Sequence, residues 1–154
     1  MSQPVGRQPF VTWGMRFGAA TGLLGLVPAV LTFAGVALST INSMTTLIVV
    51  LGLVAFLVAG LITTRVTGEV SAGALAGLVA GTLFAGLSGL GNIALALFDG
   101  PAYGVLLFAG QPSVGAGQLV LLSIVRTLTV MLLYAGLGAG LGGLGALLAR
   151  WLPR

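Results

Sequence analysis

The sequence has no cysteine and no histidine, and these two absences exclude several kinds of chemistry. A chain without cysteine forms no disulfide, binds no iron–sulfur cluster and has no thiolate zinc site. A chain without histidine lacks the commonest general base, a common metal ligand and the usual axial ligand of haem. We therefore expect no metal site, no cofactor and no enzymatic activity.

Charged residues are nearly absent as well. They make up 5% of the 154 residues, whereas about a quarter of a soluble domain is charged. The basic residues are arginines that stand singly between apolar stretches, so they form no patch that would bind nucleic acid. The acids, Glu69 and Asp99, flank one long apolar stretch and are therefore too far apart for an acid–base pair. Because 58% of the residues are hydrophobic and the mean hydropathy is +1.19, we expect the chain to lie in a lipid bilayer.

The uncharged stretches predict four membrane-spanning helices in a single domain. One span needs about 20 apolar residues, and the stretch from Arg16 to Arg65 is long enough for two. We place the turn between these two spans at the polar residues 39–43. The stretch after Glu69 and the stretch after Arg126 hold one span each. The predicted fold is an all-α antiparallel bundle of four transmembrane helices, at residues 17–39, 45–64, 72–98 and 127–149.

The positions of the arginines predict the orientation of this bundle. Loops on the cytoplasmic side of a membrane are rich in arginine and lysine. This rule places the N-terminal segment 1–16, the loop 65–71 and the C-terminal segment 150–154 in the cytoplasm, and it leaves Arg126 outside. The two tryptophans flank the cytoplasmic ends of the first and last spans, where indole rings favour the headgroup region. The use of arginine alone as the basic residue, together with abundant alanine, glycine, leucine and valine, favours the inner membrane of a bacterium.

Residues 99–126 are predicted to form the outer loop. Prolines and glycines interrupt this stretch, and its longest apolar run is too short for a span. We expect the segment Tyr103–Ala109 to lie in the membrane interface or to re-enter the membrane. In an alternative register the last helix starts at Leu119. That helix would either project beyond the bilayer or draw Arg126 into the membrane, where an arginine usually has a function.

Two charges stand at the ends of this predicted loop, Asp99 and Arg126. Their similar depth predicts an ion pair on the outer side, which at a hydrated interface contributes about 0–1 kcal/mol. The alternative is that each charge is solvated separately. An exchange of the two charges would distinguish these interpretations.

Proline and glycine within the spans predict how the helices pack. Pro28 lies in the middle of the first span, where it removes a backbone hydrogen bond and is expected to kink the helix. We interpret this kink as a packing feature, with a gating hinge as the alternative.

The third span carries small residues at every fourth position, a pattern typical of a glycine zipper. Residues four apart share one helix face, and small side chains there let a second helix approach closely. The glycines of this stripe are Gly73, Gly77, Gly81 and Gly89. The last span has the pair Gly136 and Gly140, beside a second stripe that contains Gly138 and Gly142. We predict that the stripes pack within the bundle, with an oligomer interface or a docking groove as the alternative.

Two functions remain after these exclusions. The first is a non-catalytic accessory or scaffold subunit of a larger bacterial membrane assembly, because helix-packing surfaces are abundant. Its partners would be lipid, other membrane subunits or further copies of the chain. The alternative is a small homo-oligomeric transporter or channel for an uncharged or otherwise small solute. The shortage of ionisable residues within the spans argues against this alternative, since transport of ions and protons normally requires them.

Overall fold

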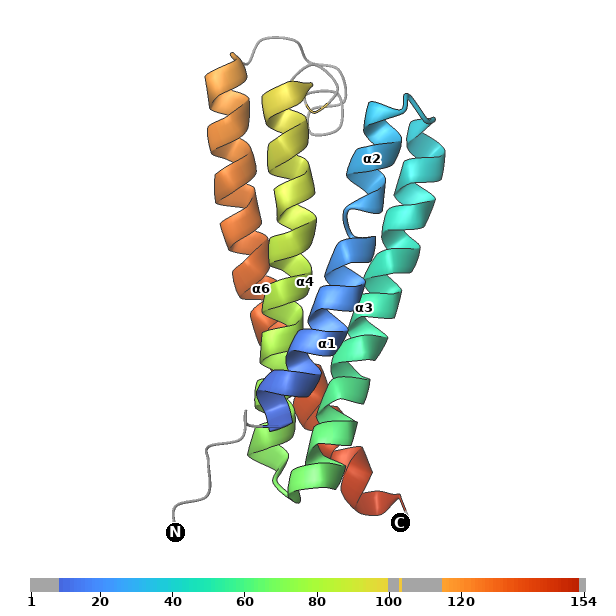
Figure 1. Cartoon of the computed structure of the whole chain (residues 1–154), viewed down its shortest axis with the longest axis vertical. Helices are drawn as coiled ribbons and strands as arrows, with labels where there is room; N and C mark the ends of the chain where they lie inside the picture. Colours follow the sequence, from blue (N-terminus) through green and yellow to red (C-terminus); the bar gives the residue numbers. More distant parts are fainter. Residues whose placement is uncertain (1–8, 100–102, 104–114, 153–154) are drawn as a thin grey trace.

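The computed structural model describes residues 9–99, 103 and 115–152, and this part of the chain is helical without any strand. The helices form an elongated antiparallel bundle, in which α1 begins and α6 ends toward the same end (Figure 1). Their bounds are Pro9–Leu24 for α1, Val27–Phe33 for α2, Leu38–Thr67 for α3, Val70–Phe98 for α4 and Ala116–Trp151 for α6.

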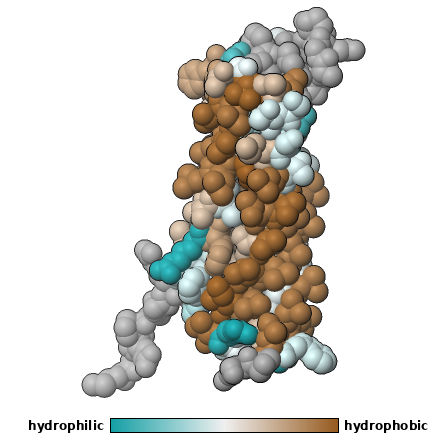
Figure 2. All heavy atoms as spheres, turned by 90° about the vertical axis from the view of Figure 1, so that its right-hand side faces the viewer, coloured by the Kyte–Doolittle hydropathy of each residue, from teal (hydrophilic) through white to brown (hydrophobic). Residues whose placement is uncertain are grey.

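Four helical segments are long and apolar enough to cross a membrane. They are Pro9–Phe33, which combines α1 and α2, then Leu38–Thr67, Val70–Phe98 and Gly117–Trp151. The shortest has 25 residues, and about 20 suffice for one crossing. Hydrophobic side chains cover most of the face shown in Figure 2. The prediction of an all-helical chain with four apolar segments of spanning length is confirmed.

The predicted turn at residues 39–43 is wrong, because these residues belong to α3. The chain reverses earlier, where Gly35 has a φ of 70° that favours glycine. Hydroxyl groups explain why the polar run stays helical. Ser43 Oγ donates to Ser39 O at 3.0 Å, and Thr46 Oγ1 donates to Asn42 O at 2.9 Å, so each hydroxyl is satisfied inside the helix.

The predicted start of the last span is also wrong, because α6 begins at Ala116 rather than at residue 127. The backbone N–H of Gly115 donates to Gln118 Oε1 at 3.2 Å, which helps to define this helix start. Residues 116–126 of the predicted outer loop are therefore helical, and Arg126 lies roughly 15 Å along the helix from Ala116. The structure thus comes nearer to the alternative register than to the preferred one.

Most of the predicted outer loop lies outside the described residues, and so does the predicted interfacial or re-entrant segment apart from Tyr103. Tyr103 is fully buried and belongs to a cluster with Leu95, Ala96 and Leu119. This cluster joins the C-terminal end of α4 to the first turn of α6.

The first span is interrupted at Gly25 and Leu26, between α1 and α2. Pro28 lies in the first turn of α2, where the missing N–H of proline costs no helical hydrogen bond. The backbone N–H of Leu26 donates to Leu23 O at 3.1 Å, so the end of α1 tightens into a short turn before α2 begins. The sequence predicted a kink here, and the structure has a full break between two helices.

Helix α4 lies at the centre of the bundle and packs against α1, α3 and α6 (Figure 1). At mid-height three aromatic rings meet from three helices. The ring centroids of Phe84 and Tyr134 are 5.1 Å apart, and those of Phe56 and Phe84 are 5.8 Å apart with an edge-to-face geometry. Below this cluster the helices are close together, and above it α2 and α3 diverge from α4 and α6 (Figure 1).

Candidate functional site

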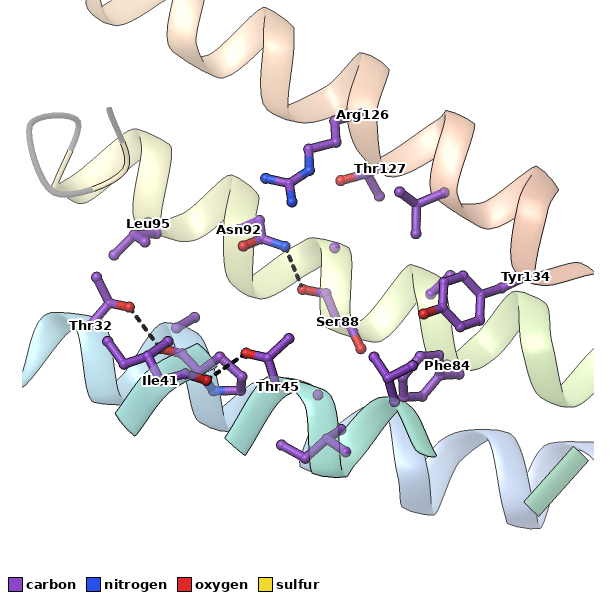
Figure 3. Close-up of a pocket in the computed structure, with 18 residues that line it drawn as sticks. Thr32, Ile41, Thr45, Phe84, Ser88, Asn92, Leu95, Arg126, Thr127 and Tyr134 are labelled. Atoms are coloured by element: carbon purple, nitrogen blue, oxygen red, sulfur yellow. Dashed lines mark hydrogen bonds between the residues drawn. The ribbon is translucent and has the colours of Figure 1, made fainter. Parts of the chain in front are cut away.

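The site most able to hold a ligand is a cavity of about 270 Å³ above the aromatic cluster. Its walls come from α2 and α3 on one side and from α4 and α6 on the other (Figure 3). We call the part of the bundle around this cavity the cavity half, and the part toward the start of α4 the closed half. The residues that line the cavity are Gly25, Pro28, Ala29, Thr32, Ile41, Thr45, Ile48, Val49, Phe84, Ala85, Ser88, Gly89, Asn92, Leu95, Arg126, Thr127, Val130 and Tyr134.

In the closed half, backbones of neighbouring helices meet at glycines. A Cβ added at Gly18 would lie 2.7 Å from Ala80 Cα, which brings α1 directly onto α4. A Cβ added at Gly77 would overlap the carbonyl oxygen of Gly138 on α6. A Cβ added at Gly60 on α3 would overlap Gly142 in the same way. Helices α1, α3, α4 and α6 therefore approach one another through their backbones in this half.

The stripe predicted on the third span faces a neighbouring helix along its length. Its members Gly73, Gly77, Gly81 and Gly89 all lie where an added Cβ would collide with another segment. The partners on α6 are backbone atoms of Gly138 and Tyr134 near the middle and the Thr127 side chain higher up.

The prediction that Gly136 and Gly140 of the last span pack inside the bundle is wrong. A Cβ added at either position meets nothing within 4 Å. Residues two apart on an α-helix point in nearly opposite directions, so only one of the two adjacent stripes can face α4. That stripe contains Gly138 and Gly142.

The break in the first span helps to create the cavity. Helix α1 ends where Gly22 meets Leu83 and Leu87 of α4, and α2 continues beside α3. Gly25 lies in the break, and a Cβ there would overlap Ser88 Oγ. The Ser88 hydroxyl is buried and has no hydrogen-bond partner among the described residues.

Several polar side chains surround the cavity, and most of them bond to their own helices. Thr32 Oγ1 donates to Pro28 O and Thr45 Oγ1 donates to Ile41 O, both at 2.8 Å. Asn92 Nδ2 donates to Ser88 O at 3.4 Å, a long hydrogen bond (Figure 3). Asn92 itself lines the cavity.

Arg126 supplies the only formal charge among the described lining residues. Its side chain extends from α6 toward Asn92 on α4 (Figure 3). Asp99, by contrast, ends α4, where its backbone N–H donates to Leu95 O at 2.8 Å. Asp99 does not line the cavity, and the pair of Asp99 and Arg126 stays a prediction.

Apolar side chains from α3 and α4 make up much of the remaining lining. Ile41 is 1% exposed and Phe84 is 4% exposed, and both contribute to the lining together with Ile48 and Leu95. A ligand in this cavity would therefore meet a cationic and hydrogen-bonding group together with hydrocarbon surface. Pockets for small molecules have this composition, although their usual volume of about 300–1,000 Å³ is somewhat larger.

Sequence reasoning identified some of these residues and missed others. It identified Arg126 through the alternative register of the last helix. It missed Thr45, because the turn was placed too late in the chain, and Thr127, because that residue stood at the predicted membrane boundary. A helical wheel of Ala116–Trp151 puts Thr127 and Tyr134 on one face, since seven residues make two turns.

We also compared the chain with known proteins. No protein-family model, no curated protein and no solved structure matches this chain. The class that the structure itself defines is a four-segment apolar helical bundle with one cavity-bearing half.

Proposed function

We propose that this chain is a non-catalytic accessory or scaffold subunit of a larger assembly in a bacterial inner membrane. In this proposal the four apolar segments span the bilayer and both termini lie in the cytoplasm. The outward face of α6 carries the proposal. Only 17% of the residues in the most apolar window of α6 are buried, compared with 44% for α4.

This outward face has the composition of a helix-docking surface. Gly136 and Gly140 lie there with open space where a Cβ would be. Large apolar side chains flank them, and Leu132 and Leu133 are 77% and 60% exposed. Two small residues four apart let a second transmembrane helix approach closely, while flanking leucines supply dispersion contacts. The inward stripe with Gly138 and Gly142 holds the chain together, and the outward pair is left for a partner.

Cross-linking and purification from native membranes test this proposal. We expect the wild-type chain to co-purify with a different membrane protein, and Gly140→Leu to lose that partner while its own thermal stability stays unchanged. Gly117→Leu is a matched control that should keep the partner, because an added Cβ there also meets nothing within 4 Å and the residue lies about six turns from Gly140. A native chain that always runs alone, as a monomer or as a homo-oligomer, would contradict the proposal.

A second candidate is a small homo-oligomeric transporter or channel, and the interrupted first span favours it. Solute sites in transporters often lie beside discontinuous helices, as this cavity lies beside the break between α1 and α2. Solute flux into liposomes that contain only this chain would support the second candidate. Flux at the level of protein-free liposomes would contradict the second candidate.

A further inference from the structure

Among its described lining residues, the cavity has one charge and no counter-charge. The sequence contains two acidic residues, and neither Glu69 nor Asp99 lines the cavity. Glu69 lies in the turn between α3 and α4 at the far end of the bundle. The described lining therefore supplies no negative charge to balance the Arg126 guanidinium, and a bound anion would supply one.

A guanidinium in a spanning segment is costly unless it is paired or hydrated. Arg126 lies inside the apolar segment Gly117–Trp151, and it makes no hydrogen bond with the described residues. The other arginines that the structure describes lie in different surroundings. Arg16 stacks on Trp13, with 5.1 Å between the guanidinium carbon and the ring centroid, and Arg65 and Arg150 line a second pocket of about 320 Å³ at the end of the closed half.

Polar donors stand beside the Arg126 guanidinium. Asn92 lies on the same side of the cavity as Arg126, and one of its amide hydrogens makes a long hydrogen bond (Figure 3). The Ser88 hydroxyl is buried next to the break in the first span without a partner among the described residues. A buried polar group left without a partner costs free energy, so both groups favour a ligand that accepts hydrogen bonds.

We infer that the cavity binds a small anion with an apolar body, which places its carboxylate or phosphate at Arg126 and Asn92. The apolar body then lies against Phe84, Ile48 and Leu95. The volume of about 270 Å³ limits the occupant to a small molecule or to the headgroup portion of a lipid. This inference concerns binding at the cavity and does not depend on the proposed partner surface of α6.

The test compares benzoate with benzamide, a neutral molecule of nearly the same shape. Binding is measured from the rise in thermal stability with ligand concentration, in a non-ionic detergent. We expect benzoate to bind the wild type at least about tenfold more tightly than benzamide, since hydrogen bonds to charged groups are roughly twice as strong as neutral ones. Arg126→Gln should abolish this preference, Arg126→Lys should retain part of it, and Arg16→Gln should leave it unchanged.

Lipid discs distinguish the two sources of the anion. If phosphatidylglycerol occupies the cavity, discs that contain it should weaken benzoate binding relative to discs of phosphatidylcholine alone, and mass spectrometry should find phosphatidylglycerol retained by the wild type but not by Arg126→Gln. Unchanged benzoate affinity in both discs would identify a free organic anion instead.

Two results would overturn the inference. One is a preference for benzoate over benzamide that survives Arg126→Gln. The other is equal binding of benzoate and benzamide, combined with retention of phosphatidylglycerol that does not depend on Arg126.

Discussion

The closed half and the cavity half of this bundle contain the same helices, yet they pack by different rules. In the closed half, glycines at Gly18, Gly60 and Gly77 bring backbones into direct contact. In the cavity half, side chains such as Phe84 and Ile48 hold the helices apart, and a break in the first span redirects the chain. This difference shows that small residues determine where the helices come into direct contact. Larger side chains and a helix break determine where a cavity remains.

The closed half should be the most sensitive part of the molecule to an added side chain. We expect Gly77→Leu to lower the free energy of unfolding by about 3 kcal/mol or more, because its side chain would overlap the Gly138 backbone on α6 and the helices would have to separate. Reversible unfolding in mixed detergent micelles measures this effect.

Gly140→Leu is the control for that change, because the residue has open space around it. Its stability should stay within about 0.5 kcal/mol of the wild type, as for surface substitutions elsewhere. Similar losses for the two variants would mean that the contrast between inward and outward glycines on α4 and α6 does not exist.

A smaller effect is expected at the junction of the two halves. Gly25→Ala should cost about 1–2 kcal/mol, because the new Cβ would overlap the Ser88 hydroxyl and lie 2.8 Å from Ser88 Cβ. In a Ser88→Gly background the same substitution should cost less, since the atoms that it meets are gone. A double-mutant cycle from unfolding measurements gives the coupling. Additive effects of the two substitutions would show that Ser88 does not pack into the break.

The general architecture of the chain is readable from its sequence, because charge gaps and apolar length locate helices of spanning size well. The ends of the helices are harder to predict. Ser39 and Asn42 look like turn residues, yet hydroxyl groups that bond back within α3 keep this stretch helical. The start of α6 is also hard to predict, because residues 116–125 carry no charge that would mark the boundary between loop and helix.

The candidate site was predictable only in part. The sequence shows that Arg126 has few acidic residues to pair with, and it shows glycines at every fourth position on α4. It does not show which of two adjacent glycine stripes on α6 faces inward, because both have the same spacing. Nor does it show that Asn92, Thr45 and Arg126 line one cavity, since that follows from the divergence of α2 and α3 from α4 and α6 beyond the break at Gly25 (Figure 1).

The contrast between a half closed by backbone contacts and a half that holds a cavity with polar and apolar lining underlies the proposals above. Because the chain has no cysteine, single cysteines can test it directly with a charged thiol reagent in proteoliposomes. Thr45→Cys reports on the cavity, Thr63→Cys on the closed half, where Thr63 is fully buried, and Leu132→Cys on the apolar surface. A thiol reacts as the thiolate, which requires water, so we expect Thr45→Cys to react at least about tenfold faster than the other two. Equal rates at Thr45 and Thr63 would contradict the account.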